Sequence, residues 1–484
     1  MTQRKQLLVD ISELVQRDSK TGIQRVVRSI LHQFLQLRPS QFAIVPVYAG
    51  CDGQLIKASS FVAKFRGSKS VGKPVDQPAD LRAGDVYLGL DLTSHMFPLC
   101  DAVIRRLQGA GVLICHVVYD LTPLGKKNWH TQHTRDTFAH WFRSIVAASD
   151  QLICISRATQ REVRDFIKKH NMRRPAKQSI TWFHLGCDLS ESKPSAGVPT
   201  GAVRLLRGLA ARPSLLMVST IEPRKGHLQV IKACDILWRR GVIFNLCIVG
   251  KLGWNSKIVD KAIRHHRLFK KRLFWISNAS DEYLELLYSK ATALLNASEA
   301  EGFGLPMVEG ARKGIPIIAR DIHVNREICG KNATYFRATN AVGLATSLKR
   351  WLQAYSEGCL PNSRKISIST WRQSAQQLLR RIENTKQTPI KHVSNQQSRK
   401  RKHLSMNEVS RVLVTAFIKL AYATILGRIP GAHEICYHQA CVEQDQAYFA
   451  QIPALFLGSE ERRRMAMREA PTSSSTKRNG RNRH

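Results

Sequence analysis

At 484 residues the chain is too long for one hydrophobic core, and its 43% hydrophobic content suits folded α/β domains. The formal net charge of +39 predicts an anionic partner, which would be a nucleotide-sugar, an acidic lipid surface or nucleic acid. Eleven cysteines without a C-x-x-C pair argue against a disulfide framework or a zinc site and favour a reducing cytosol. The amino-terminal apolar stretch is too short for a signal peptide. Val412 to Leu426, interrupted by Lys419, falls short of a membrane span.

A strand and a helix are predicted at the start of the chain. Leu7 to Ile11 is an apolar run, and an amphipathic helix opens near Lys20 to Arg25, with an apolar face of Val26, Val27, Ile30, Leu31 and Phe34. Gly22, after Thr21, lies between strand and helix, where backbone N–H groups can bind an anion. A tight turn is the commoner explanation of such a glycine.

Further strands are predicted at Phe42–Pro46, Val86–Leu88 and Val112–Tyr119, the last followed by Asp120. A carboxylate at the carboxyl end of a parallel strand faces the cleft of an open α/β sheet. A turn or helix cap explains Asp120 equally well. Later in this half, Ser156 is expected to cap a helix.

The second half opens with a strand at Leu215–Ser219, after which Arg224 and Lys225 precede Gly226 and a helix from Leu228. Two adjacent cations at the carboxyl end of a strand fit a diphosphate, since Arg offers a planar fork and Lys a compact charge. A lone Arg-Lys pair in so basic a chain is more often a solvated pair. Strands at Asn245–Val249 and Leu273–Ile276 continue an alternating α/β pattern.

The most informative stretch runs from Thr292 to Ala319. An apolar strand to Ala297 leads into a loop at Ser298–Gly304, then a helix with Pro306 in its first turn and Gly314 after its end, then a strand. Such a βαβ unit brings N–H groups and a positive helix end to one point, which suits phosphate. Glu301 and Glu309 frame the loop and can accept hydroxyls of a sugar and a ribose. Taken singly, each is more simply a helix-start or exposed glutamate.

Several of these strings resemble one family. Ser298, EGFGLP, Glu309 and GIPIIARD together resemble the E-x7-E signature of glycosyltransferase family 4, retaining enzymes of the GT-B fold. TIEPRKGH resembles that family's clamp for the donor phosphates. Ile180 to Asp188 resembles its LG-x-D segment, which implies that Gly186 and Asp188 shape the cleft between the domains. DISELVQRDSKTGIQRVVRSIL looks like the opening of family 4 mannosyltransferases that build bacterial O-polysaccharides. The resemblance implies an α/β GT-B fold, with two facing Rossmann-like domains and a small carboxy-terminal α-helical appendix.

The resemblance also implies roles for individual residues. Glu301 would bind the donor sugar and, with Asp120 on the acceptor side, form the catalytic pair. The remaining donor-binding residues would be Arg224 and Lys225 on the diphosphate, Glu309 on the ribose, and Thr21, Gly22, Gly302, Phe303, Gly304 and Leu305. The chain departs from the family pattern in three places, since Tyr119-Asp120 replaces His-Asp and His323 and Asn325 replace Pro and Phe. His116 stands too early in the strand to replace the histidine without a register shift.

The implied function is a retaining transfer of a hexose from a nucleotide diphosphate sugar, with GDP-mannose the expected donor. The acceptor would be a growing glycan or lipid-linked oligosaccharide in synthesis of surface polysaccharide, such as lipopolysaccharide O-antigen or exopolysaccharide. Retention would follow front-face attack, in which the leaving phosphate takes the acceptor proton. No metal or other cofactor is expected. The location expected is cytoplasmic, with peripheral binding to an anionic membrane and a merely solvated basic tail left as alternatives.

The expected organisation has six parts. The segment after 405 resembles a small helical module often fused to polysaccharide glycosyltransferases, and the stretch before it is basic and polar. The expected ranges are 1–195 for the acceptor-side domain, 196–212 for a linker, 213–385 for the nucleotide-sugar domain, 386–405 for a basic linker, 406–465 for the helical module and 466–484 for a disordered basic tail.

Three rivals to this function remain. A GT-B epimerase or phosphorylase would change the chemistry, and a phosphorylase would need a pyridoxal lysine that nothing in the sequence singles out. A non-catalytic scaffold would use the basic charge to bind glycan or an anionic membrane surface. A nucleic-acid binder would need aromatic residues interleaved with the cations, which the basic clusters lack, so no nucleic-acid partner is expected.

Overall fold

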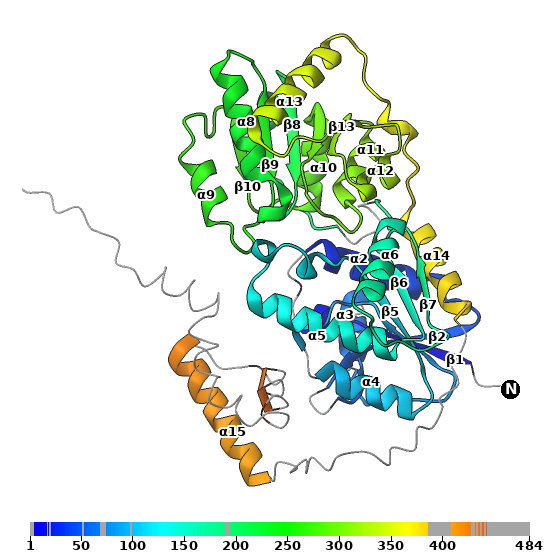
Figure 1. Ribbon diagram of the computed structural model, residues 1–484. Coiled ribbons are helices and arrows are strands. Elements are labelled where there is room, and N and C mark those ends of the chain that lie inside the picture. Colours follow the sequence, from blue (N-terminus) through cyan, green and yellow to red (C-terminus); the bar gives the residue numbers. More distant parts are fainter. Residues whose placement is uncertain are drawn as a thin grey trace, which may run out of the picture. The chain divides into compact units, whose positions relative to one another are not determined.

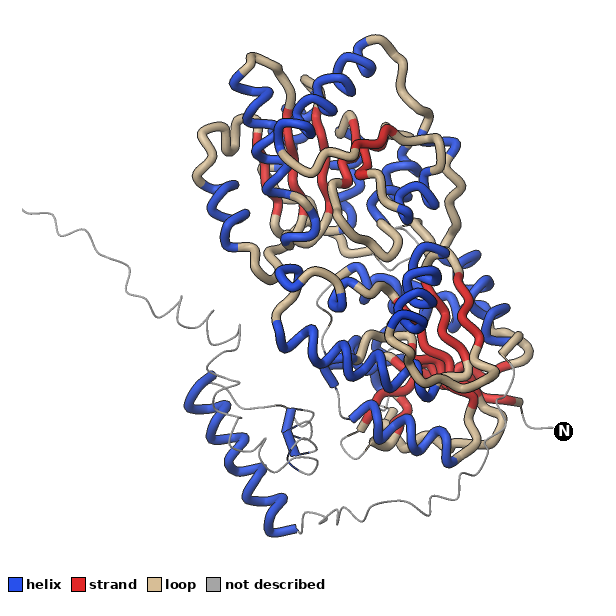
Figure 2. Tube along the Cα trace, in the orientation of Figure 1, coloured by secondary structure: helices blue, strands red, loops and turns tan. Residues whose placement is uncertain are grey.

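The computed structural model describes residues 4–16, 18, 21–50, 53–67, 74–96, 99–188, 194–385 and 408–426, together with 431, 434, 435, 438, 439 and 442. Two largely parallel sheets, each with helices on both faces, make up most of these residues (Figures 1 and 2). Both sheets belong to the first of two compact units, and helix α15 (Glu408–Ala421) belongs to the second. The two α/β domains expected from the sequence are therefore present.

The first sheet has the strand order β3-β2-β1-β4-β5-β6-β7 and is parallel from β2 to β7. Its central strands are buried along almost their whole length, as expected for a sheet covered on both faces. The strands are β1 (Lys5–Asp10), β2 (Phe42–Ala49), β3 (Leu55–Lys57), β4 (Val86–Gly89), β5 (Leu113–Val118), β6 (Gln151–Cys154) and β7 (Ser179–Trp182). The helices are α1 (Ser12–Gln16), α2 (Gly22–Leu37), α3 (Ser59–Arg66), α4 (Leu99–Gly109), α5 (Gln132–Ala148) and α6 (Arg157–Lys169).

The second sheet is parallel throughout, in the order β10-β9-β8-β11-β12-β13. The order reverses between β8 and β11, and open α/β sheets bind ligands at the carboxyl ends of the strands at such a point. The strands are β8 (Ser214–Val218), β9 (Asn245–Val249), β10 (Leu273–Ile276), β11 (Ala293–Asn296), β12 (Ile317–Arg320) and β13 (Thr334–Phe336). The helices are α7 (Ala202–Ala210), α8 (His227–Arg239), α9 (Lys257–Arg264), α10 (Asp281–Lys290), α11 (Leu305–Lys313), α12 (His323–Cys329), α13 (Ala341–Ser356) and α14 (Trp371–Glu383).

Two helices depart from a simple succession of domains. Helix α7 occupies much of the range expected as a linker, and it packs against α10. Helix α14 falls in the range assigned to the second domain, yet it packs against α2 of the first. Gly186 and Asp188 hold the start of α14, because a Cβ on Gly186 would lie 2.4 Å from the Trp371 nitrogen and the Asp188 carboxylate accepts that N–H at 2.7 Å. These two residues therefore dock a helix, where a role in shaping the cleft was expected.

The second compact unit is described only in part. Helix α15 continues into a π-helical turn (Tyr422–Leu426), and its buried residues include Val414, Ile418 and Leu426. The helical module expected at 406–465 therefore begins with a helix, but most of it, and the ranges 386–405 and 466–484, lie outside the described residues. None of the helices that the structure describes has both the length and the apolar character needed to cross a membrane.

Candidate functional site

A small pocket lies at the carboxyl ends of β8 and β11, where the order of the second sheet reverses. We call it the donor pocket. Its lining includes Ser219 after β8, Ser298 after β11, Lys225, Glu301 and Pro306. The fold thus brings the two strings that the sequence singled out, TIEPRKGH and EGFGLP, to one point.

Lys225 reaches this pocket because of Gly226. A short 3-10 turn, Pro223–Lys225, is closed by Gly226 in the left-handed region (φ 74°). A Cβ at Gly226 would lie 2.5 Å from the carbonyl oxygen of Ala297, so only glycine lets the turn lie this close to the end of β11. Lys225 Nζ is consequently 2.6 Å from Oε1 of Glu301, and Arg224 Nη1 is 3.7 Å from Oε2.

Charge is concentrated around this contact. Burial raises the pKa of Glu301, but the charges of Lys225 and Arg224 lower it by more. The pKa therefore lies below its usual value and the carboxylate stays ionised. Burial lowers the pKa of Arg224, while the carboxylates of Glu301, Glu222 and Asp120 raise it and prevail. The charge of Arg224 is thus stabilised by carboxylates from both halves of the chain, which include the predicted catalytic pair, Glu301 and Asp120.

Asp120 plays the structural role in a turn that the sequence left open. Its Oδ1 accepts hydrogen bonds from the Thr122 amide (2.9 Å) and hydroxyl (2.7 Å) at the start of a 3-10 turn, Thr122–Leu124. The ring of His130 lies 3.3 Å from the same hydroxyl, and burial lowers the pKa of His130 to about 4. A neutral imidazole therefore lies beside the predicted acceptor-side carboxylate.

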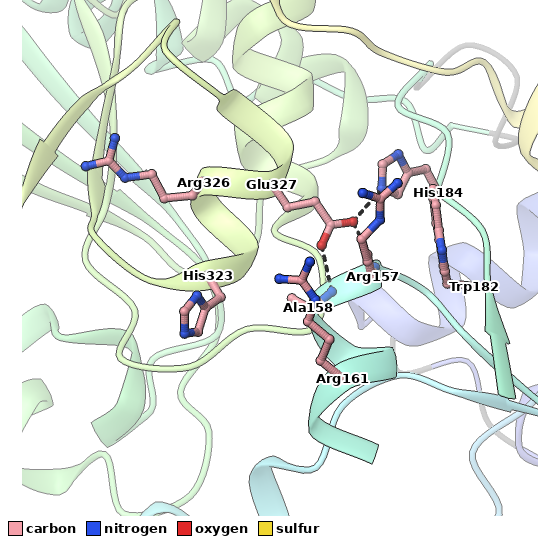
Figure 3. Close-up of a pocket in the computed structure, with 8 residues that line it drawn as sticks. All are labelled: Arg157, Ala158, Arg161, Trp182, His184, His323, Arg326 and Glu327. Carbon is pink, nitrogen blue, oxygen red and sulfur yellow. Dashed lines mark hydrogen bonds and ion pairs between the residues drawn. The ribbon is translucent and has the colours of Figure 1, made fainter. Parts of the chain in front are cut away.

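The loop that carries Glu301 is anchored to the first half of the chain. The Gly302 carbonyl accepts hydrogen bonds from Ser156 (2.7 Å) and Thr159 (3.1 Å) in the first turn of α6, and a Cβ on Gly302 would lie 2.0 Å from the Tyr119 carbonyl oxygen. Ser156 caps α6, as predicted. The carboxylate of Glu327 on α12 accepts two further N–H groups of that first turn (Figure 3). The first turn of α6 therefore holds two segments of the second half.

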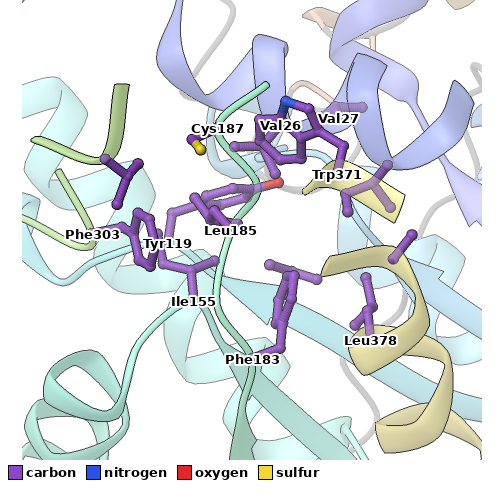
Figure 4. Packing of buried hydrophobic residues seen from close by; sticks show 14 of the residues in the cluster. Val26, Val27, Tyr119, Ile155, Phe183, Leu185, Cys187, Phe303, Trp371 and Leu378 are labelled. Atoms are coloured by element: carbon purple, nitrogen blue, oxygen red, sulfur yellow. The ribbon is translucent and has the colours of Figure 1, made fainter. Parts of the chain in front are cut away.

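The rest of the predicted donor loop supports this anchoring. The side chain of Phe303 is buried and packs among Tyr119, Ile155 and Leu185 of the first half, so only its backbone can face a donor (Figure 4). Gly304 adopts a left-handed conformation (φ 86°) that starts α11, and the half-buried Leu305 is the first residue of that helix.

Glu309 is held away from solvent by a residue of the first half. Its side chain is 3% exposed, with Oε1 accepting from Arg25 at 2.6 Å and Oε2 accepting from the Tyr288 hydroxyl at 2.7 Å. Arg25 also pairs with Asp281 at 2.7 Å. We call Arg25, Glu309 and Asp281 the Arg25 clasp. A ribose bound to Glu309 would compete with these partners.

Thr21 and Gly22 are placed at the start of α2, on the same helix as Arg25. The Thr21 hydroxyl accepts the Gln24 amide at 3.3 Å, which is an ordinary helix cap. Gly22 is exposed, with no atom within 4 Å of the position of a Cβ. The structure thus leaves room beside Gly22 and shows a local capping role for Thr21.

His116, Asn325 and His323 lie in three different environments. His116 is buried in β5 with its Nδ1 2.9 Å from the Ser149 hydroxyl, and burial lowers its pKa to about 3. Asn325 is fully buried and donates to the Arg320 carbonyl at 2.9 Å. His323 is exposed and lines a different pocket.

Sequence reasoning missed two acidic groups. Glu222 directly precedes the Pro223–Lys225 turn, is 4% exposed, and lies 3.1 Å from Arg224 Nε. Burial raises its pKa by more than Arg224 and Lys225 lower it. Asp91, after β4, is buried where the order of the first sheet reverses, and burial raises its pKa to about 7. Glu222 stands inside a string that was recognised, whereas nothing in the sequence marks Asp91.

These features define a class. Two Rossmann-like sheets meet across a site that contains a basic pair and an acidic loop, and solved glycosyltransferases have this fold. The structure of Anabaena HepE in complex with UDP and glucose aligns with 79% of this chain and 100% of its own, at 12% identity and a TM-score of 0.53. Sucrose-phosphate synthase from Thermosynechococcus elongatus aligns with 78% of this chain and 98% of its own, at 14% identity and a TM-score of 0.55. The fold is GT-B, as predicted.

Sequence comparisons match part of this chain to known glycosyltransferases. Residues 210–365 match the family described as glycosyl transferases group 1, so the chain carries a domain of that family. The serotype-specific mannosyltransferase WbdA of Escherichia coli is 40% identical over 381 residues, which are 78% of this chain and 45% of WbdA. O-antigen chain mannosyltransferase B of Escherichia coli is 25% identical over 41% of this chain and 51% of its own. The chain thus spans about half the length of these relatives. The predicted resemblance is confirmed, although these matches describe the family as group 1 and do not name family 4.

Proposed function

We propose that the protein is a retaining hexosyltransferase of surface polysaccharide synthesis, using a nucleotide diphosphate sugar as donor and a glycan or lipid-linked oligosaccharide as acceptor. The observation that carries the proposal is that Lys225 and Glu301 meet in the donor pocket, with Arg224 3.7 Å from the same glutamate. The group 1 domain and the likeness to O-antigen mannosyltransferases support the reaction class and favour mannose, with GDP-mannose as donor.

The charges of the site suit a diphosphate. Without a donor, Lys225 and Arg224 are neutralised by Glu301 and Glu222. A diphosphate entering the pocket would take over these cations, which frees Glu301 to accept hydroxyls of the donor sugar. The same two cations would then stabilise the charge that grows on the leaving diphosphate, which is the electrostatic contribution that this chemistry most requires.

Residues of the first half would serve the acceptor. The charge of Asp120 raises the pKa of Arg224, and one oxygen of Asp120 accepts hydrogen bonds from Thr122. The other oxygen is suited to orient an acceptor hydroxyl, while the departing phosphate takes the proton in a front-face attack. This route uses no metal. The chain's charge of +39 favours a peripheral position on an anionic membrane, where a lipid-linked acceptor would be found.

The test is transfer by the purified full-length protein. GDP-mannose, UDP-glucose and UDP-N-acetylglucosamine are offered with a polysaccharide-repeat acceptor on a lipid or aryl carrier, and the anomeric configuration of the product is read by NMR. We expect transfer from GDP-mannose with retention. Lys225→Ala and Glu301→Gln should each lower kcat by about 10²-fold or more, the usual loss of one preorganised group at the reacting centre.

A matched control separates the site from general basicity. Arg239→Ala removes an exposed cation on α8 that pairs with Asp235, and transfer should be unchanged. Glycan or vesicle binding by wild type with no transfer from any donor would favour the scaffold instead. Tight oligonucleotide binding without transfer would favour a nucleic-acid binder.

A further inference from the structure

A larger pocket, of about 380 Å³, lies between the two halves beside the first turn of α6 and shares no lining residue with the donor pocket (Figure 3). We call it the α6 pocket. Arg157 and Arg161 line it from α6, Trp182 and His184 from the end of β7, and His323 from α12. Its volume falls within the range of small-molecule sites, which is roughly 300–1,000 Å³.

The carboxylate in this lining is already satisfied. Glu327 accepts the backbone N–H groups of Arg157 at 2.8 Å and Ala158 at 2.6 Å, and its Oε1 is 2.7 Å from His184 Nε2. Burial raises the pKa of Glu327, but His184 and the two amides lower it by more, so the pKa lies below its usual value. The Glu327 carboxylate is therefore bound to the start of α6 and to His184, and it does not pair with the guanidinium groups of Arg157 and Arg161.

Two guanidinium groups stay available to a ligand. Within the part of the chain that the structure describes, neither Arg157 nor Arg161 has a carboxylate partner within ion-pair distance. The Arg157 guanidinium lies 4.9 Å from the ring centroid of Trp182, a cation–π contact that holds it in place. Arg326 also lines the pocket, but Figure 3 shows its side chain extending away from the others, and its guanidinium is bound to Asp321 by two hydrogen bonds.

We propose that the α6 pocket binds a small soluble molecule carrying a phosphate monoester or diphosphate, at a site separate from the donor pocket. Arginine forks match the oxygens of phosphate, His323 adds a donor at the rim, and Trp182 forms an apolar wall for the organic part of the ligand. Because the lining comes from both halves, the ligand bridges them and favours the arrangement in which α6 holds Gly302 and Glu327. The inference does not depend on which sugar, if any, the protein transfers.

The experiment is a calorimetric titration of inorganic pyrophosphate into the full-length Lys225→Ala variant, whose donor pocket has lost a cation, in the presence of saturating GDP. One binding event should remain. Adding Arg161→Gln should weaken it at least tenfold, the usual loss of one charge-assisted contact, and adding Arg157→Ala as well should abolish it. Arg239→Ala in the same background is the matched control and should bind as tightly as its parent.

Several results would overturn the inference. These are no pyrophosphate binding beside GDP, or undiminished binding when both arginines are replaced. Hexose 1-phosphate, titrated in parallel, should also bind. If soluble phosphates do not bind but vesicles containing phosphatidylglycerol do, and the arginine replacements remove that binding, the pocket recognises a membrane and not a small molecule. Arg161 is exposed on α6, so Arg161→Gln should melt like wild type by circular dichroism, which keeps the binding result interpretable.

Discussion

The Arg25 clasp provides a quantitative test of how the two halves are joined. The Arg25 side chain is 19% exposed, and its partners Glu309 and Asp281 are 3% and 12% exposed, so Arg25→Ala strands two nearly buried carboxylates. Removing one partner of a buried pair costs about 3–5 kcal/mol. Glu309 keeps the Tyr288 hydroxyl and Asp281 keeps the amide and hydroxyl of Ser195, which places the expected loss near the lower limit, at about 3 kcal/mol.

Urea unfolding followed by tryptophan fluorescence would measure this loss, and a double-mutant cycle would assign it. Glu309→Gln removes the charge that Arg25 neutralises, so Arg25→Ala should cost at least 1 kcal/mol less in that background. Arg239→Ala breaks an exposed ion pair with Asp235, one turn earlier on the same helix, and should lower the free energy of unfolding by less than about 0.5 kcal/mol. If Arg25→Ala unfolds within 0.5 kcal/mol of wild type, the clasp contributes no stability and the reasoning is wrong.

Three further outcomes are expected from the same unfolding assay. Gly302→Ala should lose about 2 kcal/mol or more, since its methyl group would overlap the Tyr119 carbonyl; an unchanged transition would mean that the halves lie farther apart. Glu327→Ala removes the carboxylate that caps α6 and should lower the free energy of unfolding by about 1–2 kcal/mol. Wild-type stability of this variant would refute the cap. Burial raises the pKa of Asp91 in the folded state to about 7, above its unfolded value. Between about pH 4 and 7 the unfolded chain therefore loses this proton while the folded protein keeps it, so the free energy of unfolding falls as the pH rises. The free energy of unfolding of Asp91→Asn, relative to wild type, should therefore rise by up to about 1.4 kcal/mol per pH unit in that window. A difference that does not depend on pH would contradict the raised pKa of Asp91.

Much of the fold was predictable because buried parallel strands read as short apolar runs between turn residues. The runs at Leu7, Leu215 and Leu294 all became central strands. Strands β3 and β13 escaped because they have only three residues each, too few for a pattern to stand out. The position of α14 was not predictable either, because packing on a helix more than 300 residues earlier leaves no local signal.

The site likewise contains residues that the sequence could identify and residues that it could not. Arg224, Lys225 and Glu301 could be found because glycines fix their loops, and a glycine is visible in sequence. The partner of Glu309 could not be found, because Arg25 lies 284 residues away and the pairing depends on how the two halves meet. Phe303 shows the limit of motif reasoning, since its place in the string suggested a ligand contact and its side chain is instead buried in the core.

The packing of α14 on α2 has a consequence for synthesis on the ribosome. In Figure 4, Trp371 and Leu378 of α14 lie near Val26, Val27 and Phe183 of the first half. The amino-terminal sheet is translated some two hundred residues before the helix that covers it. Until α14 emerges, the apolar side chains along α2 lack the helix that covers them. The first domain can therefore complete its packing only after most of the second domain has been translated.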